Sequence, residues 1–208
     1  MIIVCCGLAN AGKDQVAKRL IAKHNFIKIS FASILKDVIS VLFNWDRSKL
    51  EGDTEDGREW RETVDDWWSK KLNIPKFTPR WAMQNIGTDL FRKHFNTNIW
   101  IYALEKKLED LKDKNIVITD CRFENEYNFL KNINYCKVFF FYVERYPPPI
   151  WFKLINKDTI GILPFELHIS EWEWIKCLLS NEYTKILNYG SIDDLNTLID
   201  GKKIELNF

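Results

Sequence analysis

The stretch GLANAGKD, residues 7 to 14, places two glycines, a lysine and a carboxylate between an apolar run and a helical pattern. A glycine-containing turn at such a junction presents backbone N–H groups to a phosphate-sized anion, and the lysine can reach the outer phosphates of a nucleotide. The sequence therefore predicts an ATP-binding loop. Its predicted contact residues are Gly7, Asn10, Ala11, Gly12, Lys13, Asp14 and Gln15.

Asp14 stands where a phosphate-binding loop normally carries Ser or Thr. An ionised carboxylate cannot donate a hydrogen bond to phosphate, and it would be repelled by a triphosphate unless Mg²⁺ or a cationic side chain lay between them. The sequence therefore predicts a charge-balanced site in which Asp14 is a candidate Mg²⁺ ligand. The alternative is a carboxylate that only favours the helix N-terminus, by about 0.3 to 1 kcal/mol, and the two roles can coexist.

A second polar group follows the apolar run NIVIT (115–119). Asp120 stands at the expected carboxyl end of a strand, with Arg122 and Glu126 soon after it, and open α/β sheets bind ligands at that edge. Asp120 could hold Mg²⁺ through water or bind a sugar hydroxyl, and Arg122 could neutralise a phosphate. The alternative is an Asp120 that only caps the next helix.

The segment TPRWAMQNIGTDLFRKHF (78–95) predicts a helix with two different faces, at about 100° per residue. One face holds Arg80, Gln84, Gly87 and Phe91, and the other holds Met83, Ile86 and Leu90. Arg80 could grip a phosphate with two N–H donors, Gln84 could read a base edge, and Gly87 would leave room for a base or sugar. The alternative is an ordinary solvated face.

Short apolar runs predict five buried parallel strands, at 2–6, 26–30, 115–119, 137–143 and 184–188. Helical patterns alternate with them, near 13–23, 32–43, 80–93, 97–112, 124–132, 170–179 and 191–199. This rhythm predicts a three-layer α/β fold in which helices cover a parallel sheet. We expect one domain over residues 1–208, with a helical insertion at about 44–79 and a lid-like segment at about 145–168, where prolines exclude a continuous helix.

Two further segments carry open alternatives. In the insertion, Trp60, Trp67 and Trp68 predict a hydrophobic mini-core, with a shelf for stacking a nucleobase as the alternative. In HISEWEW (168–174), Ser170 and Glu173 fit a capping box at a helix start, and a catalytic role in this segment is the alternative. With three histidines and no HExxH pattern, we expect no structural zinc site.

The composition excludes several classes of protein. The formal net charge of +1 gives no global attraction to nucleic acid or to a membrane, so we expect neither as a partner. The five cysteines include no CxxC pair and predict reduced core residues. No segment approaches the roughly 20 apolar residues needed to span a bilayer. The expected compartment is a reducing cytoplasm, that of the host if the chain is viral.

Together these motifs resemble the deoxynucleoside monophosphate kinases known from bacteriophages and related viruses. The resemblance is carried by GLANAGKDQ, DRSKLEG with GREWRE, RWAMQNIGTDLFR with Trp100, and TDCRFENE, followed by HISE. It implies a P-loop NTPase-type kinase core that moves phosphate from ATP, with Mg²⁺, to a deoxynucleoside monophosphate (dNMP). The GKD variant belongs to the family's pattern, whereas Gln15 departs from the Thr that the family often has there.

The resemblance also implies roles for individual residues. The implied substrate-binding residues are Arg47, Arg80, Gln84, Thr88, Trp100, Asp120, Arg122 and Glu126. The predicted catalytic residues are Lys13, Asp14, Arg122 and Arg145, and the candidate ligands of Mg²⁺ are Asp14 and Asp120. Arg145, with Lys153 and Lys157, is the candidate source of lid cations that arrive on closure and exclude water.

Two other functions fit the same loop. One is another small-acceptor P-loop kinase, resembling phosphomevalonate or dephospho-coenzyme A kinases, which would use Lys13 but would need no base-reading Gln84. The other is a non-catalytic switch that binds ATP. A homodimer is the assembly to test for.

Overall fold

The computed structural model describes residues 1–146, 152, 168–180 and 182–206. The chain divides into two compact units, one made of residues 1–30 and 107–208 and the other of residues 31–106. The predicted lid at 145–168 lies outside the described residues, except for Arg145, Tyr146, Phe152 and His168.

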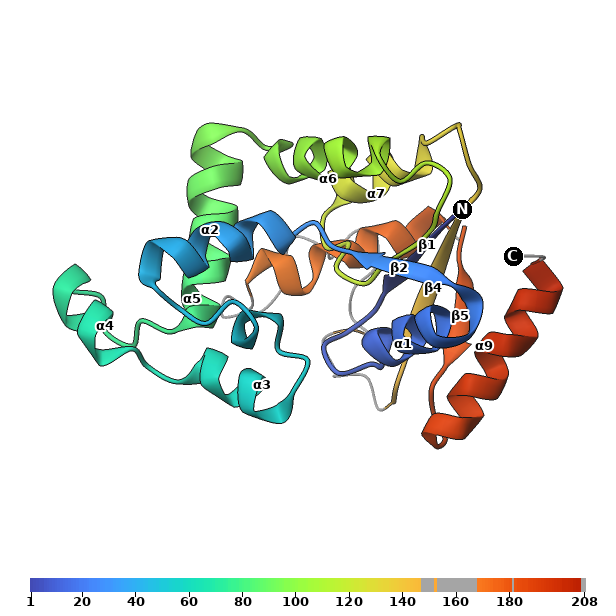
Figure 1. The fold of residues 1–208 in the computed structure, drawn as a ribbon, viewed down its shortest axis with the longest axis horizontal. Coiled ribbons are helices and arrows are strands. Elements are labelled where there is room, and N and C mark those ends of the chain that lie inside the picture. The colour runs from blue at the N-terminus through green and yellow to red at the C-terminus, as the bar shows by residue number, and fades with distance from the viewer. Residues whose placement is uncertain (147–151, 153–167, 181, 207–208) are drawn as a thin grey trace. The chain divides into compact units, whose positions relative to one another are not determined.

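The first unit is built on a five-stranded sheet with the strand order β2-β3-β1-β4-β5 (Figure 1). The strands are β1 (Ile2–Cys6), β2 (Phe26–Ile29), β3 (Asn115–Ile118), β4 (Val138–Glu144) and β5 (Thr184–Leu187). Every pairing is parallel, and Ile3 lies opposite both Val117 and Phe139. The five predicted strands and the α/β class are confirmed. The central strand β1 is buried along its whole length, as a short apolar run predicts, whereas the edge strands β2 and β5 are partly exposed.

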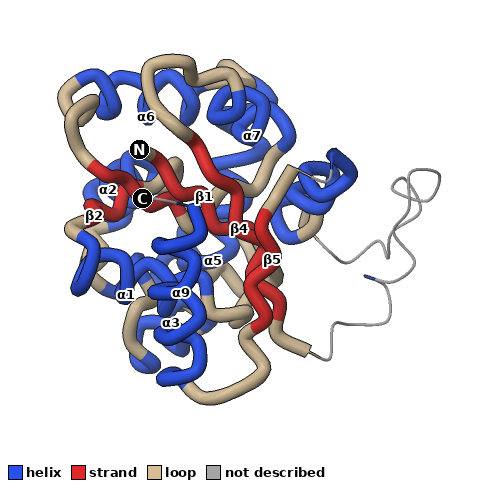
Figure 2. The backbone as a smooth tube through the Cα atoms, turned by 90° about the vertical axis from the view of Figure 1, so that its right-hand side faces the viewer, coloured by secondary structure: helices blue, strands red, loops and turns tan. Residues whose placement is uncertain are grey.

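Alternate strand residues point to opposite faces of the sheet, and each face has its own helices. On one face Ile3, Phe141 and Val143 belong to a buried cluster with residues of α1 (Lys13–His24) and α9 (Ile192–Leu206). Figure 2 shows α1 and α9 beside each other, on the opposite side of the sheet from α7 (Glu124–Lys131).

The second face is covered by α7 and by the 3₁₀ helix η4 (Glu173–Ser180). The ring of Tyr127 in α7 lies 4.5 Å from that of Phe140, measured between centroids, and the ring of Trp174 in η4 lies 5.9 Å from that of Tyr142. Phe140 and Tyr142 alternate with the residues of β4 that face α1 and α9. The sheet is therefore sandwiched between two layers of helices, as predicted.

The regular elements of the second unit are all helices. Its elements are α2 (Ser33–Phe43), η1 (Lys49–Glu51), α3 (Glu55–Glu62), α4 (Asp66–Leu72), α5 (Pro79–Gln84), η2 (Asn85–Phe95) and α6 (Ile99–Glu109), the last of which ends beyond the unit. Thr54, Asp65 and Thr78 set three of the helix starts, since each side chain accepts a hydrogen bond from the backbone N–H three residues later.

An aromatic cluster forms much of the core of this unit. The ring of Phe43 lies 4.6 Å from that of Trp45 and 5.0 Å from that of Trp68, and Trp45 lies 5.8 Å from Trp60. The indole N–H of Trp68 donates to the backbone carbonyl of Phe43 at 3.1 Å. The predicted mini-core is confirmed for Trp60 and Trp68. Trp67 differs, because it is 59% exposed; its ring meets that of Trp68 edge-on.

The predicted helix at 80–93 has an unexpected form. It begins as α5, with Pro79 in the first turn, and continues as an eleven-residue π-helix, η2. A π-helix closes its hydrogen bonds one residue later than an α-helix. The face of Arg80, Gln84, Gly87 and Phe91 that we predicted from α-helical periodicity therefore does not hold beyond Gln84.

The cysteines lie mostly in the core, as predicted. All five cysteines carry free thiols, and four of them are buried. None of the helices within the described ranges has both the length and the apolar character needed to cross a bilayer.

Candidate active site

The loop between β1 and α1 has the geometry that the glycine pattern predicts. Gly7 has φ +150°, Asn10 has φ +61° and Gly12 has φ +103°, so the chain turns through backbone conformations that L side chains rarely adopt. A Cβ added to Gly7 would lie 2.4 Å from the carbonyl oxygen of Val143, which no side chain tolerates. The loop follows the carboxyl end of β1 and opens α1, which is the arrangement that cradles a phosphate.

Lys13 lies across this loop. Its ammonium group donates to the backbone carbonyls of Gly7 at 2.9 Å and Leu8 at 2.8 Å. Burial lowers the pKa of Lys13, and the positive charge of Arg122 lowers it further, against the opposing effect of Asp14. Lys13 and Arg122 are therefore two neighbouring cations of the same unit, which is the electrostatic setting that favours an anion.

Asn188, the residue after β5, supports the loop. Its side-chain amide donates to the carbonyl of Ala11 at 2.9 Å, and its own backbone N–H donates to the carbonyl of Glu144 at 2.9 Å. A Cβ added to Gly12 would lie 2.4 Å from the amide nitrogen of Asn188, so the glycine is required for this close approach.

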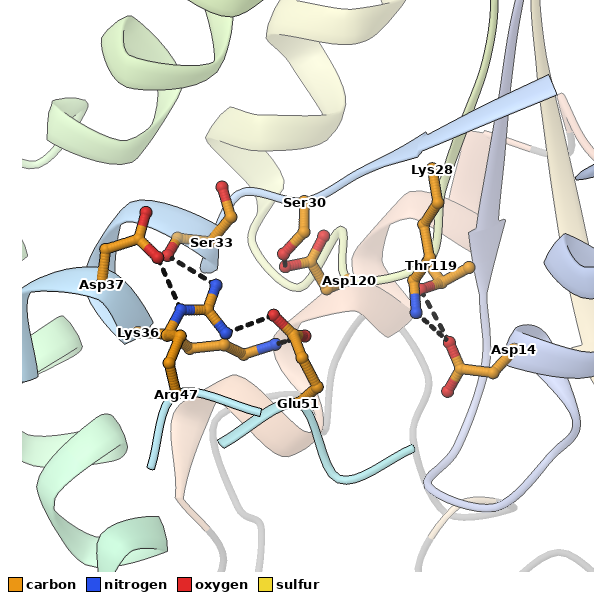
Figure 3. Close-up of polar contacts among 10 residues, drawn as sticks. All are labelled: Asp14, Lys28, Ser30, Ser33, Lys36, Asp37, Arg47, Glu51, Thr119 and Asp120. Atoms are coloured by element: carbon orange, nitrogen blue, oxygen red, sulfur yellow. Dashed lines mark hydrogen bonds and ion pairs between the residues drawn. The ribbon is translucent and has the colours of Figure 1, made fainter. Parts of the chain in front are cut away.

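Two side chains donate hydrogen bonds to Asp14. The ammonium of Lys28, on β2, lies 3.0 Å from its Oδ1, and the hydroxyl of Thr119 donates to the same oxygen at 3.1 Å (Figure 3). Burial alone would raise the pKa of the Asp14 carboxyl, but the charge and hydrogen bond of Lys28, with the hydrogen bond of Thr119, hold it below its ordinary value. The charge balance that the sequence predicts is thus supplied within this structure by Lys28.

Asp120 lies at the same edge of the sheet, after β3. The hydroxyl of Ser30 donates to its Oδ2 at 2.6 Å, as Figure 3 shows. Asp14, in the first turn of α1, accepts a hydrogen bond from Thr119, the residue before Asp120. Mg²⁺ is commonly bound by one or two carboxylates together with substrate phosphates. The chemistry of these donors fits a Mg²⁺ ion that arrives with a nucleotide.

The loop before α7 is held by a buried carboxylate. Glu126 is 2% exposed, and its Oε2 accepts from the backbone N–H of Arg122 at 2.8 Å and of Phe123 at 3.1 Å. This contact fixes the backbone of Arg122, while the guanidinium of Arg122 reaches Glu171 at 3.4 Å. Glu126, which we predicted to meet the deoxynucleotide, therefore binds the loop that carries Arg122.

His168 begins the next described segment. Its Nδ1 lies 2.8 Å from the hydroxyl of Ser170 and accepts from the Ser170 backbone N–H at 3.3 Å, at the start of η3 (Ile169–Glu171). The capping contact is thus made by His168 rather than by a Ser170–Glu173 box. Arg145, the predicted lid cation, is exposed just after β4, and Lys153 and Lys157 lie outside the described residues.

In the helical unit, Arg47 lies within a network of carboxylates. Its guanidinium contacts Asp37 and Glu51 and donates to the backbone carbonyl of Ser33 at 3.2 Å, and Glu51 also pairs with Lys36 (Figure 3). Burial alone would lower the pKa of Arg47, but both carboxylates raise it. Arg47 is therefore a permanent cation whose anion sites are filled by two side chains of its own unit.

The remaining predicted substrate residues lie on α5, η2 and α6. Arg80 pairs with Glu62. Gln84 is half-buried at the end of α5, and Thr88 is half-buried on η2. Trp100 is 6% exposed, and its indole N–H donates to the carbonyl of Gly87 at 2.9 Å, so its ring is part of the core.

Comparison with known proteins assigns the family. A family model described as "Deoxynucleotide monophosphate kinase" matches residues 58–147. A protein of Acanthamoeba polyphaga mimivirus named "Putative deoxynucleotide monophosphate kinase" is 33% identical over 144 residues, which cover 64% of this chain and 69% of that protein. The chain belongs to the deoxynucleotide monophosphate kinase family. The family predicted from the motifs is confirmed, and family membership makes the chain a phosphotransferase acting on a small substrate.

The fold of this deoxynucleotide monophosphate kinase family member is that of the P-loop kinases. The solved dephospho-CoA kinase from Campylobacter jejuni is similar to it with a TM-score of 0.50 and 17% identity, covering 98% of this chain and 96% of that one. At this identity the likeness concerns the fold alone. It agrees with the parallel sheet and with the loop between β1 and α1.

Sequence reasoning missed three polar residues around the loop of this family member: Lys28, Thr119 and Asn188. Lys28 had a visible signal, because it is a charged residue in the otherwise apolar run FIKI of β2. Thr119 and Asn188 had none, since each is simply the last residue of a predicted strand. All three become recognisable only when the sheet order brings the strand ends together.

Proposed function

We propose that the chain transfers the γ-phosphate of ATP to a deoxynucleoside monophosphate, giving ADP and a deoxynucleoside diphosphate. The observation that carries the proposal is the loop between β1 and α1, in which the ammonium of Lys13 lies 2.9 Å and 2.8 Å from the carbonyls of Gly7 and Leu8, with the charge of Arg122 close enough to lower the pKa of Lys13 further. Two cations held together favour binding of an anion, and the loop amides supply further donors to it.

The work of the loop is electrostatic. Lys13 would exchange its contacts with the carbonyls of Gly7 and Leu8 for oxygens of the outer phosphates. Arg122 would offset charge on the transferring group. Its backbone N–H donates to the carboxylate of Glu126, which holds Arg122 in place. A Mg²⁺ ion bound near Asp14 and Asp120 would neutralise charge on the phosphates.

The acceptor needs little acid–base help. The attacking oxygen of a monophosphate is already anionic near neutral pH, so the requirement is alignment of two anions that repel one another. Arg47 and Arg80, in the helical unit, are the residues proposed to hold the acceptor phosphate. Each is now paired with a carboxylate, which the acceptor would replace.

Base recognition is assigned to Gln84. Its amide offers a donor and an acceptor, which suits the edge of a nucleobase. Trp100 would act through the backbone of Gly87 rather than by stacking on the base, because its indole ring is buried.

The test is a direct assay of products. The protein is incubated with Mg-ATP and each of the four common dNMPs, and the nucleotides are separated by ion-exchange chromatography. We expect a dNDP and ADP in equal amounts, and a loss of at least about a hundredfold in rate for Lys13→Met with every acceptor. Turnover only with phosphomevalonate or dephospho-coenzyme A, or ATP binding without turnover, would overturn the proposal in favour of another kinase or of a switch protein.

A further inference from the structure

The phosphate loop of this chain carries a negative charge where a negatively charged ligand would bind. Asp14 directly follows Lys13 in the first turn of α1, where a triphosphate would approach. A bare carboxylate at this point repels phosphate oxygens, whereas the Ser or Thr usual in such loops does not.

Two neighbouring side chains offset the charge of Asp14. Lys28 and Thr119 both donate to Oδ1 of Asp14, at 3.0 and 3.1 Å. Among the described residues none donates to Oδ2. Figure 3 shows both donors converging on the same end of the carboxylate. One oxygen of Asp14 is therefore neutralised by an ammonium ion, and the other remains available to a ligand.

Lys28 is the one charged residue of β2. It lies within β2, an edge strand, paired with Val117 of β3, and its neighbours Ile27 and Ile29 are apolar. The pair with Asp14 does little for folding, because the side chain of Asp14 is 58% exposed and that of Lys28 is 30% exposed. The pair therefore matters chiefly for the charge that the loop presents to a ligand.

We propose that Lys28 is a positioning residue that acts as the counter-charge of the phosphate loop: its ammonium neutralises Asp14 so that ATP can bind, and it competes with a divalent cation for the same carboxylate. This inference rests on the proposed ATP site. It predicts that Lys28 matters most when divalent metal is absent, because metal then cannot take over the neutralisation of Asp14.

The experiment measures ATP affinity by isothermal titration calorimetry, once in EDTA and once in saturating Mg²⁺. The proteins are the wild type, Lys28→Met, Asp14→Asn and the double variant, with Lys18→Met as a matched loss of an exposed lysine from α1. In EDTA we expect Lys28→Met to weaken ATP binding by at least about tenfold. The double variant should return to within about threefold of the wild type, since the uncompensated charge is then gone.

The second part of the experiment repeats the titrations in saturating Mg²⁺. With Mg²⁺ present, the deficit of Lys28→Met should shrink to about threefold or less, and Lys18→Met should match the wild type in both conditions. An equal deficit with and without Mg²⁺, or no rescue by Asp14→Asn, would show that Lys28 does not act by neutralising Asp14 and would overturn the inference. An unchanged affinity for Lys28→Met in EDTA would overturn the inference while leaving the proposed function intact. A wild type that binds no ATP would overturn the proposed function itself, and the inference with it.

Discussion

The side-chain amide of Asn188 donates a hydrogen bond to the backbone carbonyl of Ala11, 177 positions earlier in the chain. Asn188 is 7% exposed, and its backbone is itself bonded to Glu144 at the end of β4. The end of β5 is thus fixed to the end of β4, and it supports the phosphate loop that follows β1. The curvature of the loop depends on this distant residue as well as on its own glycines.

Replacing Asn188 by Ala should therefore affect both stability and ligand binding. We expect a loss of about 1 to 2 kcal/mol in the free energy of unfolding, because the buried carbonyl of Ala11 loses its donor, and a several-fold weaker affinity for ATP. Urea denaturation and calorimetric titration measure the two effects. Asn128→Ala, an exposed change on α7, is the matched control. Unchanged ATP affinity in a destabilised Asn188→Ala protein would show that the contact supports the fold alone.

Glu126 offers a test of a buried carboxylate. Glu126→Ala should lower the free energy of unfolding by about 2 to 4 kcal/mol, because the backbone N–H groups of Arg122 and Phe123 lose a buried acceptor. Glu126→Gln keeps an oxygen acceptor and should lose less than half as much. Chemical denaturation checks both, with the exposed Glu105→Ala as the control. A stable Glu126→Gln protein with a raised KM for dNMP would instead indicate a direct contact with substrate.

The parallel sheet could be predicted from the sequence, for a physical reason. Strands that are buried on both faces must be short apolar runs, so IIVCC and NIVIT can be recognised as strands. Parallel strands need a crossover connection, usually a helix, so the helices between them can be predicted as well. The loop could also be predicted, because its glycines, Lys13 and Asp14 are contiguous and need no tertiary information.

The rest of the site could not be predicted in this way. The contacts of Asp14 with Lys28 and Thr119 span 14 and 105 positions, and they exist only because β2, β3 and β1 are neighbours. The π-helix η2 was missed because periodicity arguments assume the commoner α-helical turn, and π-helices are rare.

Gly87 has a steric role that can be tested by compensation. A Cβ added to it would lie 2.5 Å from Cδ2 of Leu35, so Gly87→Ala should lower the free energy of unfolding by about 1 to 3 kcal/mol. In combination with Leu35→Ala the added methyl has space, and the double variant should be more stable than the sum of the single changes by about 1 kcal/mol. Gly201→Ala on α9 meets no atom within 4 Å and should be neutral or stabilising. Strict additivity would contradict the steric explanation.

Asp200 should give the first unit a measurable pH dependence. It receives hydrogen bonds from Arg19 and His24 of α1, and these hold its pKa at about 2. The unfolded carboxyl has a pKa of about 3.9, so the unfolded chain takes up the proton first as pH falls. The stabilisation is therefore full above about pH 5 and is lost progressively towards pH 2.

Thermal unfolding between about pH 2 and 7 measures this dependence. Asp200→Asn should have a lower Tm at neutral pH and a shallower decline below about pH 4 than the wild type. The exposed Asp110→Asn should follow the wild type. Parallel declines for the wild type and Asp200→Asn would assign the acid sensitivity to other carboxylates.

Gln84 is the residue that we propose to read the base of the acceptor. It is half-buried at the last position of α5, where the π-helix begins, and its amide can donate and accept. If it reads a base edge, Gln84→Ala removes hydrogen bonds that only some bases make, so kcat/KM should fall by about tenfold for the preferred dNMP and much less for the others. Parallel assays with four dNMPs measure the ranking, and Lys13→Met, which should lower all four alike, shows what a loss of transfer without base reading looks like. An equal fall for every base in Gln84→Ala would mean that Gln84 positions α5 and takes no part in recognition.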